Sequence, residues 1–189
     1  ETANVTDFEA GPDSALELPS LTLPLTGTRL SADRGGILSF PVLTGFDNGN
    51  FSLGGFSTTG PGGTLDAPDL VTIADSTIQT VASSLAMFDS LDAIIDTNTT
   101  VRDTSVVLAP LLTSYTASSI GTRLEVSTNA VFDAPLLADI TNLSFDVRNG
   151  AVVDLPSVTQ YVVNVLNVSP AGVTLFDVSR FVVASQLLL

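Results

Sequence analysis

The chain has 189 residues with no cysteine, histidine, lysine or tryptophan, and six arginines against 20 acidic residues give a net charge of −14. These absences exclude a zinc finger, a thiol nucleophile, a haem ligand, a Ser-His-Asp triad, a lysine Schiff base and a P-loop. The acidity, with a pI near 4.1, would repel nucleic acid, so we expect no nucleic-acid partner.

Residues 1–14 do not share the pattern of the rest of the chain, and they carry four acidic residues together with the apolar Val5 and Phe8. We expect this segment to cap its own first unit or to dock on a neighbouring subunit. The chain starts at Glu1 without a basic-apolar signal, which is interpreted as a processed, mature N-terminus or an excised fragment.

From residue 15 to residue 189 one motif recurs eight times. Each copy has apolar residues three before, one before and two after an anchor position, and often a large apolar residue five after it. The anchors are spaced by 21 to 27 residues and are Pro19, Pro41, Pro68, Asp89, Pro110, Pro135, Pro156 and Ser179. Apolar-x-apolar is strand alternation, and proline removes a backbone donor, so each repeat is predicted to be a strand, a corner and more strand.

A unit of this length cannot bury its own apolar side chains, so successive units must stack and share one core. The sequence therefore predicts an all-β protein, a parallel β-solenoid of about eight coils. The alternative is a β-sandwich or jelly roll, which has no reason to repeat one motif. The longest apolar run, Val106–Leu112, has seven residues and contains Pro110, so we expect no transmembrane segment.

The pattern in Leu155-Pro156-Ser157-Val158 and in the segment 67–73, APDLVTI, resembles the leucine-rich and β-helical repeats of large microbial cell-surface proteins. The resemblance covers most of residues 15–189, without the asparagine ladder of typical leucine-rich repeats. It implies display on a surface, with a role in binding or assembly rather than in a reaction.

Two segments carry hard oxygen ligands on predicted loops, and they make calcium a candidate cofactor. These are the stretch 47–50, DNGN, and the trio Asp92, Asp96 and Asn98. Neither has EF-hand spacing, and ordinary turn chemistry explains both equally well. We expect no other metal or cofactor. The longest anchor spacing contains Leu53-Gly54-Gly55-Phe56, which is predicted to protrude as a loop suited to recognition.

Arg102, Arg123 and Arg148 each follow an anchor by 13 residues in three consecutive repeats. Equal offsets predict vertical alignment in a solenoid, where stacked like charges need anions beside them. Asp103, Glu125 and Asp146 are the expected partners in a solvated arginine-acid ladder. The functional alternative is a stripe that grips the carboxylates of an acidic glycan or of a partner chain.

We expect no enzymatic activity, although β-helices often host polysaccharide lyases and hydrolases. Acids could supply a catalytic pair, but no pair stands out. The acids two before their anchors are expected to point outward, and they are Asp66, Asp133, Asp154 and Asp177. The phenylalanines near the anchors are expected in the core rather than on a sugar platform, and they are Phe88, Phe132 and Phe176.

The last repeat ends without a charged cap, and its apolar residues include Phe181, Val183, Leu187 and Leu189. Because solenoid ends expose a strand edge and the core, we expect this end to meet the N-terminal segment or first coil of another copy. Such a head-to-tail contact propagates as a filament unless it closes into a ring.

Five of the nine asparagines lie in Asn-X-Ser/Thr sequons, which makes them candidate glycosylation sites; they are Asn4, Asn50, Asn98, Asn142 and Asn167. Their glycosylation would fit a secreted or cell-surface protein. The sequence thus favours an extracellular structural subunit that assembles with its own copies by end-to-end β-stacking. The alternative is a monomeric adhesin or glycan-binding surface module.

Overall fold

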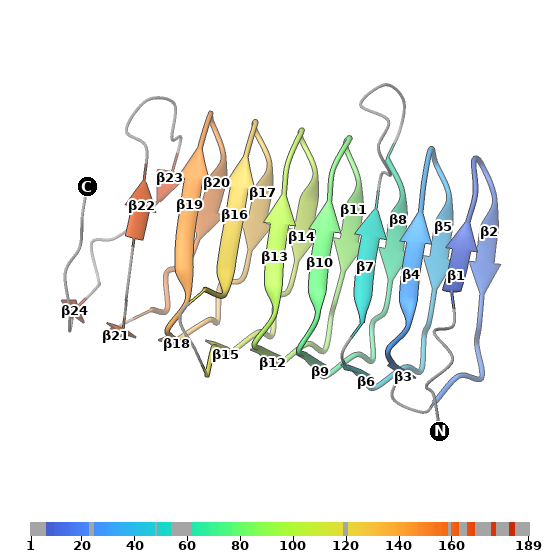
Figure 1. Ribbon diagram of the computed structural model, residues 1–189, viewed down its shortest axis with the longest axis horizontal. Helices are drawn as coiled ribbons and strands as arrows, with labels where there is room; N and C mark the ends of the chain where they lie inside the picture. Colours follow the sequence, from blue (N-terminus) through green and yellow to red (C-terminus); the bar gives the residue numbers. More distant parts are fainter. Residues whose placement is uncertain are drawn as a thin grey trace.

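The computed structural model describes residues 7–22, 25–47, 49–53, 62–118, 121–158, 160–162, 166–168, 175–176 and 182–183. In this part of the chain all regular structure is β-strand, and 24 strands form three parallel sheets of eight strands each. Successive strands enter the three sheets in turn, so each strand pairs with the one three places later (Figure 1). The chain therefore winds as a parallel β-solenoid, in which one coil holds one strand from each sheet.

The strands are short and follow one another at nearly constant intervals. The first sheet contains β1 (Asp7–Ala10), β4 (Arg29–Ala32), β7 (Asn50–Leu53), β10 (Thr77–Thr80), β13 (Asn98–Val101), β16 (Arg123–Ser127), β19 (Ser144–Arg148) and β22 (Leu166–Val168). The second contains β2 (Ala15–Glu17), β5 (Ile37–Ser39), β8 (Thr64–Asp66), β11 (Leu85–Met87), β14 (Val106–Leu108), β17 (Val131–Asp133), β20 (Val152–Asp154) and β23 (Leu175–Phe176). The third contains β3 (Leu25–Thr26), β6 (Gly45–Asp47), β9 (Thr72–Ala74), β12 (Ala93–Ile95), β15 (Ser114–Thr116), β18 (Asp139–Thr141), β21 (Gln160–Val162) and β24 (Val182–Val183).

The parallel pairing confirms the predicted solenoid and excludes the sandwich, whose sheets are antiparallel. About six coils are described over nearly their whole course, slightly fewer than the eight predicted, and the strands of the remaining coils complete the sheets. The first coil begins earlier than the repeat motif, because β1 pairs with β4 in register from Asp7 opposite Arg29. Within the described residues, no helix is long and apolar enough to cross a membrane.

The anchors of the repeat form the corner between the second and third sheets. In the second coil the carbonyl of Phe40 accepts a hydrogen bond from the N–H of Leu43 at 3.2 Å, and the same bond recurs at each described anchor. Pro41 is thus the second residue of a four-residue β-turn, where the φ that its ring fixes is favourable. Asp89 takes the same place in the fourth coil. The predicted proline corner is therefore confirmed.

The other two corners rest on residues with positive φ. The corner from the third sheet to the first has one such residue in each coil where it is observed, and these residues are Gly27, Asp75, Asp96, Gly121 and Asn142. The corner from the first sheet to the second has two in succession in several coils, which are Arg34–Gly35, Ala82–Ser83, Asp103–Thr104, Thr128–Asn129 and Asn149–Gly150. Glycine, asparagine and aspartate tolerate this left-handed conformation best, so these corners select residue types without a single motif.

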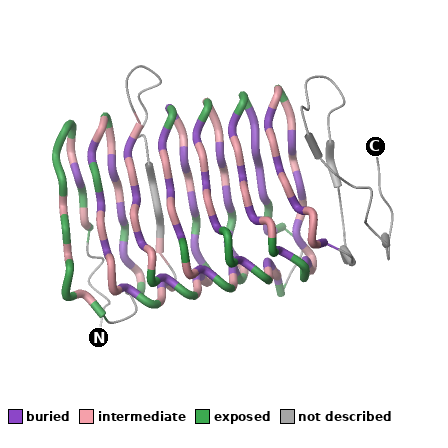
Figure 2. The backbone as a smooth tube through the Cα atoms, turned by 180° about the vertical axis from the view of Figure 1, so that it is seen from behind, coloured by how far each residue is buried: buried purple, intermediate pink, exposed green. Residues whose placement is uncertain are grey.

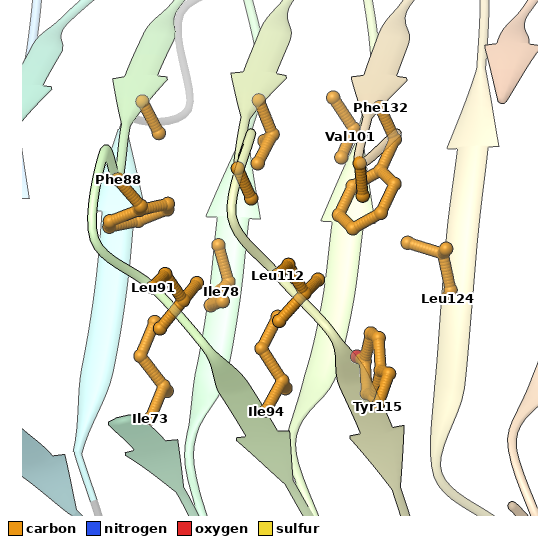
Figure 3. Close-up of a cluster of buried hydrophobic side chains, with 14 of the residues drawn as sticks. Ile73, Ile78, Phe88, Leu91, Ile94, Val101, Leu112, Tyr115, Leu124 and Phe132 are labelled. Atoms are coloured by element: carbon orange, nitrogen blue, oxygen red, sulfur yellow. The ribbon is translucent and has the colours of Figure 1, made fainter. Parts of the chain in front are cut away.

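The core runs along the inside of the three sheets. In the second to sixth coils all four motif positions are buried, as Figure 2 shows by the alternation of purple with pink along the strands. In Figure 3 Leu91 lies beside Leu112 and Ile73 beside Ile94 on neighbouring coils, with Phe88 next to Leu91. The predicted core roles of Phe88 and Phe132 are confirmed, whereas the side chain of Phe176 lies outside the described set.

Buried hydroxyl groups satisfy the backbone at the corners between the third and first sheets. Ser76 Oγ donates to the carbonyl of Ala74 at 2.5 Å and accepts the N–H of Gly49 from the coil before at 3.1 Å. Thr97 repeats the arrangement one coil later, toward the carbonyl of Ile95 and the N–H of Ser76. Each hydroxyl thus satisfies one backbone N–H and one backbone carbonyl that have no partner in the sheet ladders.

Candidate functional site

A cluster of three arginines and two acids lies on the outer face of the first sheet. Arg102 directly follows β13, Arg123 and Glu125 are the first and third residues of β16, and Asp146 and Arg148 are the third and fifth residues of β19. Alternate residues of a strand point to the same face. The residues between them are buried in the core, so these five side chains share the outer face.

Glu125 is the centre of this arginine cluster. Its Oε1 accepts hydrogen bonds from Arg102 Nε at 2.7 Å and from Arg148 Nη2 at 2.9 Å, and its Oε2 lies 2.9 Å from Arg123 Nη2. Asp146 bonds to Arg123 and has its Oδ1 3.8 Å from Arg148 Nε. The cluster is one connected network of charges rather than a set of separate surface pairs.

Burial within the cluster is uneven. The Glu125 side chain is 5% exposed, although it points away from the core, whereas the three guanidinium side chains are 41–44% exposed. The hydrogen bond that Arg148 donates to Glu125, together with the charge of Asp146, raises the pKa of Arg148 above its usual value. Three positive charges face two negative ones, so the cluster has one excess positive charge in a chain of net charge −14.

The predicted vertical row of three arginines is wrong for Arg123. Pairing sets Arg123 opposite Ser144 and Arg148 opposite Ser127, four residues further along the strand. Val101 pairs with Val126, so Arg102 and Arg148 share one column while Arg123 starts another. The longer connection between β15 and β16 shifts the offset counted from the anchor. Arginines and acids do pair, but around one buried carboxylate rather than as a ladder.

The first coil forms the other candidate site, because it ends all three sheets. β1, β2 and β3 are each an edge strand with one partner in the described structure. Phe8, Leu16, Leu18 and Leu21 pack against the core but stay only partly buried. Phe8 makes an edge-to-face contact with Phe40, with ring centroids 6.1 Å apart. This end therefore presents apolar side chains together with unpaired backbone.

An apolar hollow of about 410 Å³ opens at this end. It is lined by Phe8, Leu18, Pro19, Ser20 and Leu21. Of the residues predicted to assemble, Phe8 is therefore placed at an end of the solenoid. Val183 lies in β24, the edge strand of the third sheet at the opposite end, and Val5, Phe181, Leu187 and Leu189 lie outside the described residues.

The sequons occupy different positions in the coils. Asn50 and Asn167 lie in the first-sheet strands β7 and β22, while Asn4 lies outside the described residues. Asn98 begins β13, is exposed, and its Oδ1 accepts the backbone N–H of Arg123 at 3.0 Å. Asn142 is half-buried at a left-handed corner, where its Nδ2 donates to the carbonyl of Ala117 at 3.0 Å. Asn98 is thus the more accessible of these two amides.

The acidic side chains of one candidate calcium segment, Asp92 and Asp96, are engaged in other hydrogen bonds. Asp92 Oδ1 accepts a hydrogen bond from Thr113 Oγ1 at 2.5 Å, and Asp96 Oδ1 accepts from Ser118. Over the residues that the structure describes, no three acidic side chains are grouped so that they could hold a metal ion. Asn48, in the other segment, lies outside those residues.

The outer face of the second sheet carries a feature that the sequence motif did not reveal. Asp66, Asp133 and Asp154 occupy its outward positions, as predicted, and Asp177 lies outside the described residues. Aliphatic residues form a neighbouring outward column on consecutive strands, at Leu85, Val106, Val131 and Val152. At the following corner Leu111 and Leu136 are 50% and 47% exposed. Strands of three residues are too short for this outward pattern to stand out in the sequence.

Comparison with known proteins assigns no family. No protein-family model, no curated protein and no solved structure matches the chain. The functional argument therefore rests on the arginine cluster and the first coil alone.

Proposed function

We propose that this chain is an extracellular structural subunit that joins copies of itself end to end by β-stacking, forming a filament or surface layer. The repeat's resemblance to microbial cell-surface repeats supports display outside the cell. The five sequons and the lack of cysteine are compatible with that location.

The observation that carries the proposal is the first coil. Among the described residues its three strands have sheet partners on one side only, and its apolar side chains surround an open hollow. A strand edge of this kind is a template for pairing with another chain. A further coil would pair the three strands and fill the hollow together, and a second copy supplies such a coil by strand addition.

Light scattering and electron microscopy test the proposal on the purified chain. Mass should grow with concentration, and images should show fibres with the width of one solenoid. Phe8→Asp places a charge in the hollow and should suppress growth, while Asp47→Asn on the outer face of the third sheet should leave it unchanged. A single monomeric mass over the whole concentration range, with short separate rods, would refute the proposal.

The arginine cluster favours a second function, binding of an acidic glycan. Its guanidinium groups are two-fifths exposed and exceed their acidic partners by one charge, and guanidinium suits bidentate carboxylate contacts. Replacing Arg102, Arg123 and Arg148 together with glutamine should abolish retention on immobilised polygalacturonate. Arg34→Gln is the matched control, since Arg34 is exposed but pairs only with Asp33 among the described residues. Unchanged retention of the triple variant would remove this candidate.

A further inference from the structure

The register of each sheet runs unbroken from one end of the described structure to the other. In the first sheet Phe8 lies opposite Leu30, and Phe145 opposite Leu166. The second sheet has matching pairs at its two ends, which are Leu16 with Leu38 and Val153 with Phe176. The third sheet has Leu25 with Phe46 and Tyr161 with Val183. Leu166, Phe176 and Val183 therefore hold, at the last coil, the register positions that Phe8, Leu16 and Leu25 hold at the first.

The hydrogen bonds between coils follow a fixed pattern at the anchor corner. The residue before each anchor donates its N–H to the next coil, at the residue that ends the second-sheet strand. Leu18 donates to Ser39 at 3.0 Å and Phe40 to Asp66 at 2.9 Å. Three later coils repeat the bond, at Ala67 to Met87, Phe88 to Leu108, and Ala109 to Asp133. Three residues after the anchor the direction reverses, since Val71 donates to Thr44 and Thr113 to Asp92, both at 3.0 Å. Each coil thus offers N–H groups and carbonyls to both neighbours, at positions that repeat from coil to coil.

Both observations restrict what can cover the first coil. A preceding coil in the same orientation would repeat this hydrogen-bonding pattern and continue the register of all three sheets. Two first coils placed face to face would run their strands antiparallel and reverse the order of the three sheets. Such a contact would replace the parallel ladders and the register that every described pair of neighbouring coils keeps.

We infer that the first coil is covered by the last coil of a second copy, in parallel orientation and with no shift of register. Leu166 of one copy then lies opposite Phe8 of the next, Phe176 opposite Leu16, and Val183 opposite Leu25. The contact continues the coil-to-coil packing that each described coil already makes within the chain. This inference rests on the proposed end-to-end assembly and adds its polarity and its register.

The absence of cysteine from the chain allows a clean cross-linking test on assembled protein. Glu9 is outward and exposed in β1, next to Phe8, and Asn167 follows Leu166 in β22. Across the inferred contact these two positions lie opposite each other, about 4.8 Å apart, which is within the reach of a disulfide. Oxidation of the double variant Glu9→Cys/Asn167→Cys should give a ladder of covalent multimers on non-reducing denaturing gels.

Three variants calibrate the result. Glu9→Cys/Ser31→Cys joins two residues that already pair within the chain, so it should form an intramolecular disulfide and prove that the chemistry works and the fold is kept. Asp7→Cys/Asn167→Cys is displaced by two residues, to about 8 Å, and should not cross-link. The single variant Glu9→Cys should give no dimer.

The outcomes separate the inference from the proposed function. Fibres in which Glu9→Cys alone forms dimers would show face-to-face first coils, and would overturn the inference while the assembly stands. Fibres in which the Asp7 pair cross-links and the Glu9 pair does not would overturn the register. Absence of fibres, with the Glu9/Ser31 control intact, would refute the proposed function itself, and the inference with it.

Discussion

The first coil and the fourth coil have the same motif but differ in burial. In the fourth coil Phe88 and Leu91 are fully buried, whereas in the first coil Leu18 and Leu21, at the same motif positions, stay partly exposed. The difference is the number of neighbours, because in the described part of the chain the fourth coil is packed on both sides and the first on one. The motif therefore specifies the shape of a coil, while its neighbours supply the free energy that keeps it folded.

The largest test of this comparison is truncation of one core phenylalanine in each of the two coils. Phe88→Ala should lower the free energy of unfolding by about 3–5 kcal/mol, since a fully buried ring leaves a cavity that two flanking coils hold open. Phe8→Ala should cost clearly less in the unassembled chain, because part of that ring already contacts solvent. Urea unfolding followed by circular dichroism measures both, and equal losses would contradict the role assigned to the neighbouring coils.

A second contrast concerns two acids on the outer face of the first sheet, Glu9 in the first coil and Glu125 in the sixth. Glu125→Gln removes the anion that three guanidiniums share, and should cost about 2 kcal/mol, because the arginines then repel one another. The loss should shrink in 1 M salt, which screens that repulsion. Glu9→Gln, at an exposed position, should stay within about 0.5 kcal/mol. Urea unfolding at low and high salt distinguishes the two.

The interior of the fifth coil contains a tyrosine hydroxyl, whereas the first coil has a leucine at the corresponding register position. Tyr115 is fully buried, and its hydroxyl donates to the carbonyl of Thr97 at 2.5 Å and bonds to Thr99 at 2.8 Å. Burial raises the pKa of this hydroxyl above its ordinary value, and the bond to Thr99 opposes the shift slightly. Tyr115→Phe should therefore cost about 1 kcal/mol at neutral pH.

The same variant predicts a pH dependence. In the unfolded chain Tyr115 ionises at about pH 10, while in the folded chain it stays neutral to higher pH. The stability of the natural chain should thus be complete below about pH 10 and fall as the pH rises further. Tyr115→Phe should lose less over that range, measured by urea unfolding at pH 8 and pH 11. A parallel decline in both proteins would assign the alkaline loss to other groups.

The smallest expected effect lies at the anchor corner. Asp89 occupies a turn position that proline fills at six other anchors, and the residue before it is a phenylalanine, as before Pro41. Asp89→Pro should therefore raise the free energy of unfolding by about 0.4–1 kcal/mol, by restricting the unfolded chain. Pro68→Ala in the third coil should lower it by a similar amount. A destabilised Asp89→Pro chain would mean that the fourth corner differs from the others.

Most of the fold was predictable because one residue type, proline, marks the same corner in most coils. Counting from the anchors placed Leu43, Leu70 and Leu112 in the core. The same count failed at Arg123, since the extra residues before β16 have no composition that announces a longer corner. The other two corners escaped notice because aspartate, alanine, threonine and asparagine all serve there with positive φ.

The candidate site was predictable only in part. The sequence predicts that the arginines pair with Glu125 and Asp146. It does not reveal that three arginine side chains, from two strands and one corner, contact the single carboxylate of Glu125. That convergence depends on register between β13, β16 and β19, which local sequence does not encode.

The anchors at Pro68, Asp89 and Pro110 follow one another at identical steps of 21 residues. Removal or duplication of one such step would bring each remaining strand against a neighbour of the same kind, with corners and hydroxyl pairs still aligned. The gene can therefore lengthen or shorten the rod in increments of about 4.8 Å. The length of this protein can therefore change through the number of coils, while the contact between neighbouring coils stays the same.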